Sequence, residues 1–297
     1  MIPQRRWNGG APARSRGYVL LLVLFVVALA AAAMAGICRM SLEKAVHASR
    51  AEAELHRRWA IITCRSVLLN KAEAVLSKAQ GPVSEVRREI ALGGLKYTLI
   101  FGDEQAKANV NLLYAQSGLA GAEREVRSIV QASGAAIPVE LRPIPGRGKM
   151  FGSPDADENE PLAFEGFGQV FGRTQPQVLV AGRGAAPSAT AGITCWGDGS
   201  LNLRRASDEA VRAVLAHHLP AGEISRLLAF RARNPKLEDS ELLDALALPA
   251  ARREAVEDLL TSESACHSLW IISDSGDRNG YDLAITEGEA AVIMFNW

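Results

Sequence analysis

The sequence has few of the residues that small-molecule chemistry needs, and it has no excess of charge of either sign. Five of its 297 residues are histidine, four are cysteine and 6% are aromatic. Lysine and arginine together number 33, as do aspartate and glutamate, so no overall basic field would attract nucleic acid. A hydrophobic share of 48% beside 22% charged residues excludes a disordered tail and a multi-span membrane protein.

The motifs of common enzymes and metal sites are also missing. The chain contains no C-x-x-C pair, no H-E-x-x-H and no G-x-S-x-G, which argues against a zinc site, a zinc peptidase and a serine hydrolase. His217 and His218 end a predicted helix before Pro220, where imidazoles commonly bind free carbonyl groups. We therefore expect no enzymatic activity, no catalytic residue and no nucleic-acid partner.

The cysteines leave two interpretations open. Cys38 lies at the end of an apolar run and Cys64 in a helical stalk, and both are expected to be unpaired thiols. Cys195 and Cys266 could form a disulfide in an oxidising compartment, or they could be two separate buried thiols.

One long apolar run stands near the N-terminus. Residues 18–38 (YVLLLVLFVVALAAAAMAGIC) carry no charge, and as a helix they would span about 32 Å, enough to cross a bilayer core of about 30 Å. Four arginines and no acidic residue precede the run, which favours a cytoplasmic N-terminus and an exported C-terminal part. A removed secretory signal is the alternative, because the alanine-rich end offers cleavage sites.

The apolar run continues into a predicted helical stalk. Residues 39–80 contain no proline or glycine, and Gly81-Pro82 ends the pattern. We expect residues 18–80 to form one helix of about 60 residues. Its heptad pattern is irregular, so a sheet or another helix should cover its apolar stripe. The stripe consists of Leu42, Val46, Leu55, Trp59, Ile62, Val67, Leu69, Val75 and Leu76.

The rest of the chain predicts strands at both ends of a helical region, which indicates an α+β fold with a helical subdomain inserted into a small antiparallel sheet. Residues 135–192 are rich in glycine and proline, and Asn279-Gly280 is a hairpin-turn signal. The expected strands are 95–101, 268–273, 281–286 and 289–295, and the expected helices are 112–132, 160–171, 207–218, 221–233 and 238–260.

Several segments, in order, resemble one known family. Arg16-Gly17 followed at once by the apolar run is similar to a prepilin leader that is cut between Gly17 and Tyr18. Asp103-Glu104, with Asn109-Val110-Asn111-Leu112 after it, and the later Trp196-Gly197-Asp198-Gly199-Ser200-Leu201-Asn202-Leu203 are similar to two turns of the K-type minor pseudopilins (GspK) of type II secretion. The chain departs from that family at Arg204-Arg205, where Asn-Thr is more usual, and at Tyr18, where Phe or Met is more usual.

This resemblance implies a domain layout and a location. It implies a leader at 1–17, a transmembrane and stalk helix at 18–80, the first part of a pilin-like sheet at 81–111, an inserted, mainly helical subdomain at 112–262 and closing strands at 263–297. It also implies a single-pass protein of the inner membrane with a periplasmic head and a methylated N-terminus. The implied partners are the prepilin peptidase, the other minor pseudopilins, the major pseudopilin and the inner-membrane secretion platform.

Leu22, the fifth residue after the expected cut, predicts a place at the filament tip. Most pilin-like subunits have glutamate there, and its absence is similar to the K-type subunit. A glutamate can neutralise the buried N-terminal ammonium of the subunit already in place, because an unpaired charge is costly in a low-dielectric bundle. A chain with Leu22 cannot attract a predecessor in that way. Leucine is also an ordinary residue of a membrane helix.

Three alternatives stay open. The same leader fits a minor pilin of a type IV pilus. Paired helices with Arg204, Arg205, Arg212, Arg226, Arg231 and Arg233 could form a membrane-anchored, helix-hairpin-helix-like DNA-binding protein. Calcium could bind at residues 155–160 or 274–280, although a solvated loop and a hairpin turn are the better explanations of these acidic segments, so no metal ligand and no cofactor is assigned.

Overall fold

The computed structural model describes residues 15–79, 81–147, 162–172, 174–180, 188–235, 239–274, 279–287 and 291–296. The chain divides into two compact units, Met1–His56 and Arg57–Trp297. The predicted layout treats residues 18–80 as one helical element. From Arg57 onward this element packs on a sheet and belongs to the globular unit.

The N-terminal helix is continuous, as the sequence predicted. Helix α1 runs from Ser15 to Thr63 and passes into a π-helical turn (Cys64–Leu68), a 3-10 turn (Leu69–Lys71) and the short helix α2 (Ala72–Leu76). From Tyr18 to Leu76 these elements form a single 59-residue helix. The absence of glycine and proline from the stalk explains why these helical elements follow one another without a loop up to Leu76.

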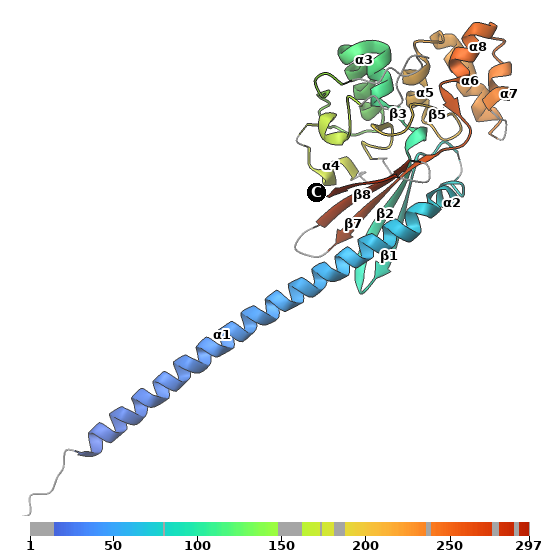
Figure 1. Cartoon of the computed structure of the whole chain (residues 1–297). Coiled ribbons are helices and arrows are strands. Elements are labelled where there is room, and N and C mark those ends of the chain that lie inside the picture. The colour runs from blue at the N-terminus through green and yellow to red at the C-terminus, as the bar shows by residue number, and fades with distance from the viewer. Residues whose placement is uncertain are drawn as a thin grey trace, which may run out of the picture. The chain divides into compact units, whose positions relative to one another are not determined.

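Five antiparallel strands form the sheet of the globular unit, in the order β1-β2-β7-β8-β9 (Figure 1). They are β1 (Glu85–Leu92), β2 (Leu95–Asp103), β7 (Cys266–Asp274), β8 (Asn279–Glu287) and β9 (Ala291–Asn296). Strand β1 was not predicted. It is an edge strand whose residues 87–89 are charged and exposed, and these charges obscure the alternation of apolar residues in the sequence. Gly93-Gly94, both with positive φ, make the hairpin turn that leads to β2.

The helical segment from residue 57 to 76 covers one face of this sheet. Its buried residues are mostly small or flexible, and they share a core with alternate residues of β2 and β7. They are Ala60, Ile61, Cys64, Leu69, Ala72 and Leu76, packed against Tyr97, Leu99, Phe101, Leu269 and Ile271.

The stripe predicted for this contact was therefore partly wrong. Leu69 and Leu76 face the sheet, but Trp59, Ile62 and Val67 are exposed. Small side chains at Ala60 and Cys64 let the helix lie close to the sheet, and the π-helical turn shifts the helical register by inserting extra chain. Helical spacing of bulky residues alone cannot anticipate either effect.

The segment between β2 and β7 covers the other face, so the predicted α+β arrangement with an inserted helical subdomain is confirmed. Its core includes Ile100, Trp270 and Leu283, which lie directly opposite one another on neighbouring strands. The inserted helices are α3 (Val110–Ala132), α4 (Pro176–Val180), α5 (Asp208–Leu215), α6 (Ala221–Arg233), α7 (Asp239–Asp244) and α8 (Ala250–Glu257), with a 3-10 turn at Phe167–Gln169. Two parallel bridges join β3 (Ala108–Asn109) to β4 (Ile193–Thr194) and β5 (Leu201–Asn202) to β6 (Leu260–Thr261).

Three local predictions need correction. The helix expected at 160–171 is, from residue 162 on, a loop with one 3-10 turn, whose Phe164, Phe167 and Phe171 are buried in the core. The helix expected at 238–260 is two helices, α7 and α8. Ala247, with a positive φ of 50°, lies between them, and Pro249 is the N-cap of α8. Asn279-Gly280 belongs to β8, not to a turn.

Glycine at position 280 is explained by packing and not by a turn. A Cβ atom at this position would lie 2.6 Å from Arg57 Nη1 and 2.7 Å from Ser273 Oγ. The guanidinium of Arg57 crosses the glycine and pairs with Asp282 at 3.0 Å. Glycine at position 280 thus leaves room for the ion pair between Arg57 of the helical segment and Asp282 of β8.

We predict that Gly192→Ala destabilises the globular unit. An added Cβ would lie 2.4 Å from Ile129 Cγ2 in the core, and overpacking of this kind costs about 1–3 kcal/mol. Gly222→Ala is the matched control, because nothing lies within 4 Å of its Cβ and alanine suits a helix. Denaturant unfolding of the full chain in detergent, followed by tryptophan fluorescence, measures both. Equal stabilities of the two variants would contradict the packing described here.

Candidate functional site

The residues predicted for processing and assembly lie at the start of α1. Gly17 and Tyr18 are consecutive helical residues, and Leu22 follows Tyr18 by one helical turn. The side chains of Tyr18 and Leu22 are 71% and 52% exposed. Within this helix an 18-residue window reaches a mean hydropathy of 2.8 with none of it buried, so the helix is long and apolar enough to serve as a single-pass anchor.

The acidic motif that the sequence singled out forms a buried polar network where the chain leaves β2. Each polar side chain of this stretch is at most 4% exposed and makes at least one hydrogen bond. A chain that buries this many polar groups has to satisfy them internally. The residues are Asp103, Glu104, Gln105, Lys107, Asn109 and Asn111.

Lys107 is the charged centre of the network. Its ammonium is 1% exposed and lies 2.7 Å from Glu104 Oε1 and 3.0 Å from Glu85 Oε1. Ser188 and Thr190 donate hydrogen bonds to Glu85. The lysine thus ties strand β1, the end of β2 and the loop that follows residue 187 to one another.

Two asparagines connect the same stretch to the inserted subdomain. Asn109 caps α3 by accepting from the backbone N–H groups of Asn111 and Leu112, and its amide donates to the carbonyl of Trp196. Asn111 donates to the carbonyls of Phe164 and Cys195. These roles explain the Asn-x-Asn pattern: the first amide starts a helix, and the second satisfies the backbone of two loops.

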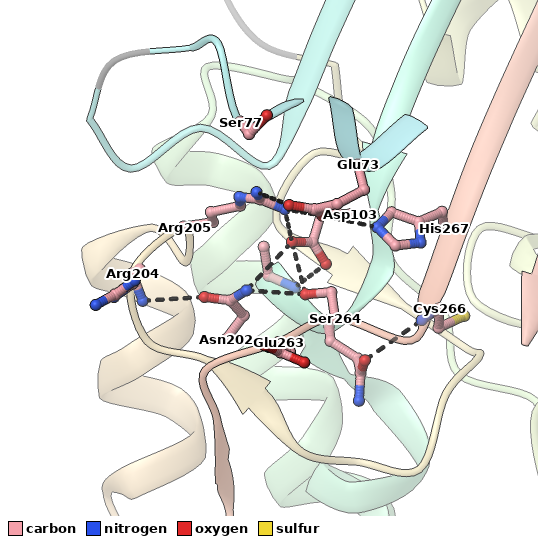
Figure 2. Close-up of polar contacts among 12 residues, drawn as sticks. Glu73, Ser77, Asp103, Asn202, Arg204, Arg205, Glu263, Ser264, Cys266 and His267 are labelled. Atoms are coloured by element: carbon pink, nitrogen blue, oxygen red, sulfur yellow. Dashed lines mark hydrogen bonds and ion pairs between the residues drawn. The ribbon is translucent and has the colours of Figure 1, made fainter. Parts of the chain in front are cut away.

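Arg205 links the inserted subdomain to α2 and β2 (Figure 2). Its guanidinium donates to both oxygens of Glu73, at 2.6 and 2.7 Å, and to Asp103 Oδ2 at 3.0 Å. Asp103 also accepts from Ser264, and Asn202 donates to Ser264. A forked arginine contact of this kind fixes orientation as well as distance. The sequence marked Arg205 as a departure from the family pattern and as a candidate DNA-binding arginine, so its internal role was missed.

These contacts shift the pKa values of the charged partners. The hydrogen bonds from Arg205 hold the pKa of Glu73 below its usual range, although partial burial opposes them. The hydrogen bond to Glu73 raises the pKa of Arg205. Burial alone would lower the pKa of Lys107, but the charges of Glu104 and Glu85 outweigh it and raise that pKa. All three groups therefore keep their charges at neutral pH.

The network offers structural rather than catalytic chemistry. A groove of about 1060 Å³ opens beside it, lined by Glu73, Asn202, Arg205 and Ser264 among others, but these side chains already bind one another. Cys195 and Cys266 are buried thiols, not a disulfide, which favours the second of the two interpretations. Among the residues that the structure describes, no three potential ligands gather as a metal site.

The two acidic segments considered for calcium do not form a described site. Residues 155–160 lie outside the described residues, and so do residues 275–278 of the second segment. Asp274 and Asn279 are the ends of β7 and β8 and pair with each other. The second segment therefore connects two strands, as the hairpin interpretation required, and not two helices as in an EF-hand.

Two of the six arginines proposed for DNA binding are engaged inside the molecule. Arg205 is held by Glu73 and Asp103, and the buried guanidinium of Arg231 donates to the carbonyls of Leu203 and Ala206. Neither can contact a phosphate without breaking these bonds. Arg226 also lies 3.9 Å from Glu223. Part of the positive charge seen in the sequence therefore serves internal contacts.

No family model and no curated protein matches the chain. Among solved structures, the chain is similar to one chain of the crystal structure of the GspK–GspI–GspJ complex from the type 2 secretion system of enterotoxigenic Escherichia coli. The likeness covers 84% of this chain and 99% of that chain, with 14% sequence identity and a TM-score of 0.46. Values this low decide neither fold nor function, so the function has to be argued from the chain's own residues.

We predict that Lys107→Met destabilises the globular unit by about 3–5 kcal/mol at neutral pH, because Glu104 and Glu85 would be left as unpaired buried charges. Lys96→Met removes an exposed lysine of β2 and should change the unfolding free energy by less than about 0.5 kcal/mol. A Lys107 variant as stable as the Lys96 control would show that the ion cluster of Lys107, Glu104 and Glu85 does not stabilise the globular unit.

We predict a pH effect from Glu73. Its pKa is lowered in the folded state, so its stabilisation is present above the unfolded value of about 4.3 and is lost as the pH falls through the folded value. Glu73→Gln should remove this part of the pH dependence, with a loss at pH 7 of about 1 kcal/mol or less because Glu73 is half exposed. Unfolding midpoints measured between pH 3 and 7 test it, and parallel curves for both proteins would refute it.

Proposed function

We propose that the chain is a K-type minor pseudopilin of type II protein secretion. The observation that carries the proposal is the 59-residue helix: its apolar first part is continuous with the segment that packs on the sheet. An apolar run that only directs export has no need to share an unbroken helix with the folded domain. A subunit that enters a filament needs such a helix first as a membrane anchor and then as a bundle element.

Two further features support the proposal. Arg16-Gly17 stands directly before the apolar run, as in a prepilin leader. The two asparagine turns that resemble this family hold the buried network together, through Asn109 and Asn111 in one and Asn202 in the other. The motifs therefore have a structural role in this chain, which supports the proposal.

The mature subunit would begin at Tyr18, carry a methylated N-terminus and keep a periplasmic head. Leu22 in the place of glutamate supports a position at the filament tip, where no earlier subunit has to be attracted and from which assembly can begin. The partners of such a subunit are the other minor pseudopilins, the major pseudopilin and the inner-membrane platform. The role is structural, without enzymatic activity, catalytic metal or nucleic-acid ligand.

We predict that the prepilin peptidase removes residues 1–17. N-terminal sequencing of the membrane-extracted protein should give Tyr18 as the first residue in cells with the peptidase and Met1 in cells without it. Gly17 lies directly before the cut, so Gly17→Asp should leave the leader attached. A mature start beyond residue 30 would mean ordinary secretion and would remove the proposed function.

The secretion and pilus alternatives differ in the phenotype of a deletion. Loss of a minor pseudopilin should stop export of the secreted enzymes of the type II pathway and leave pili on the cell. Loss of a type IV minor pilin should reduce piliation and leave that export unchanged. Complementation with the full chain should restore whichever process was lost.

A further inference from the structure

The helical segment that covers the sheet is not uniform along its length. Residues 57–63, which we name the lower segment, are the last residues of α1, and α2 follows only after the π-helical turn and the 3-10 turn. The helix therefore changes type twice between Thr63 and Ala72. Lys71, at the end of the 3-10 turn, has φ −107° and ψ 7°, outside the range of a regular helix. Such turns inside a helix often mark a hinge.

The part of the segment beyond these two turns is held firmly on the sheet. Leu69, Ala72 and Leu76 are at most 2% exposed and belong to the core beneath the helix. Between the last two, Glu73 of α2 pairs with the guanidinium of Arg205 at 2.6 Å. Apolar burial and a forked ion pair together fix α2 in place.

The lower segment is held by less. Its buried residues are Ala60 and Ile61, each 7% exposed, and its Arg57 pairs with Asp282 of β8 at 3.0 Å. Stabilisation by burial grows with the apolar area removed from water, and an alanine contributes only a methyl group to that area. Separating the lower segment from the sheet should therefore require less free energy than separating α2.

Two hydroxyl groups are buried beneath the helical segment. Tyr97 of β2 and Ser273 of β7 lie directly opposite each other, and each is 1% exposed. Tyr97 shares its core with Ala60, and a Cβ added to Gly280 would meet both Ser273 Oγ and Arg57 Nη1. Neither hydroxyl has a hydrogen-bond partner among the described protein groups. A buried hydroxyl without a partner costs free energy, which is regained when water reaches it.

We propose that the lower segment lifts off the sheet, with residues 64–71 as the hinge and α2 as the fixed part. Lifting brings water to the two hydroxyls and separates Arg57 from Asp282. Because α1 continues into the lower segment, the same movement redirects the helix that precedes it. The proposal deepens the proposed function and rests on it for the role of the movement: a subunit that passes from a bilayer into a filament needs a helix whose direction can change.

The test compares two matched cysteine variants of the full chain in detergent. Ala60→Cys places a thiol on the lower segment and Ala72→Cys places one on α2, and both alanines are buried in the same core. Iodoacetamide at about pH 8 alkylates a thiol when solvent reaches it, and mass spectrometry of the peptides follows positions 60 and 72 separately from the natural cysteines. Position 60 should react about 100-fold faster than position 72. Rates within about twofold of each other would overturn the proposal, because both thiols would then be reached only when the whole unit unfolds.

Second substitutions in Ala60→Cys show whether lifting is what exposes position 60. Asp282→Asn weakens the ion pair that holds the lower segment and should raise the alkylation rate about tenfold. Tyr97→Phe removes a buried hydroxyl without a partner and should lower the rate at least about twofold. Asp208→Asn is the matched control and should leave the rate unchanged, because its partner Arg231 belongs to the inserted subdomain. A rate that Asp282→Asn does not change, or that Tyr97→Phe raises, would contradict lifting.

A second readout separates this proposal from the proposed function. Tyr97→Phe combined with Ser273→Ala should hold the lower segment on the sheet, so this variant should be cut to Tyr18 like the parent but should secrete at least about threefold less. If the parent is not processed at Tyr18, the proposed function fails, and the alkylation rates still decide whether the lower segment lifts. If the parent is processed and positions 60 and 72 react equally, only lifting fails. Normal secretion by the double variant, with slowed alkylation, would refute the role given to the movement.

Discussion

The globular unit depends on a single electrostatic constraint: Lys107 is buried, so its charge has to be matched inside the protein. Two carboxylates from different segments provide the match, Glu104 directly after β2 and Glu85 at the start of β1. A Cβ at position 102 would lie 2.4 Å from Ser268 Oγ and 3.2 Å from Lys107 Nζ, so glycine suits this position next to the ion pairs. The ion cluster thereby fixes where the sheet ends and where the inserted subdomain begins.

Around that point the sheet serves as a partition between two hydrophobic cores. One core joins the helical segment to Leu99, Phe101 and Ile271, and the other joins the inserted subdomain to Ile100 and Trp270. The Arg205–Glu73 contact connects the inserted subdomain to α2 at the edge of this partition. The helical segment 57–76 and the inserted subdomain are thus held together by polar contacts with defined geometry, while apolar packing holds each of them to the sheet.

The sequence predicted the features that depend on long, regular patterns. These include the continuous N-terminal helix, the closing strands and the bounds of α6, all of which follow from residue periodicity. It failed where a tertiary contact decides the structure. Gly280 resembles a turn residue but makes room for Arg57, and β1 is hidden by its exposed charges. The structural role of Arg205 could not be predicted because its partners, Glu73 and Asp103, lie more than 100 residues away in the chain.

The buried thiols carry a consequence for how the protein matures. Burial raises the pKa of the Cys64 thiol to about 11 and also raises that of Cys195, so in the folded chain almost none of either sulfur is present as the reactive thiolate. An oxidising environment can therefore cross-link these cysteines only before the domain closes. In an oxidising compartment, rapid folding would protect the chain from wrong disulfides, and slow folding would expose it to them.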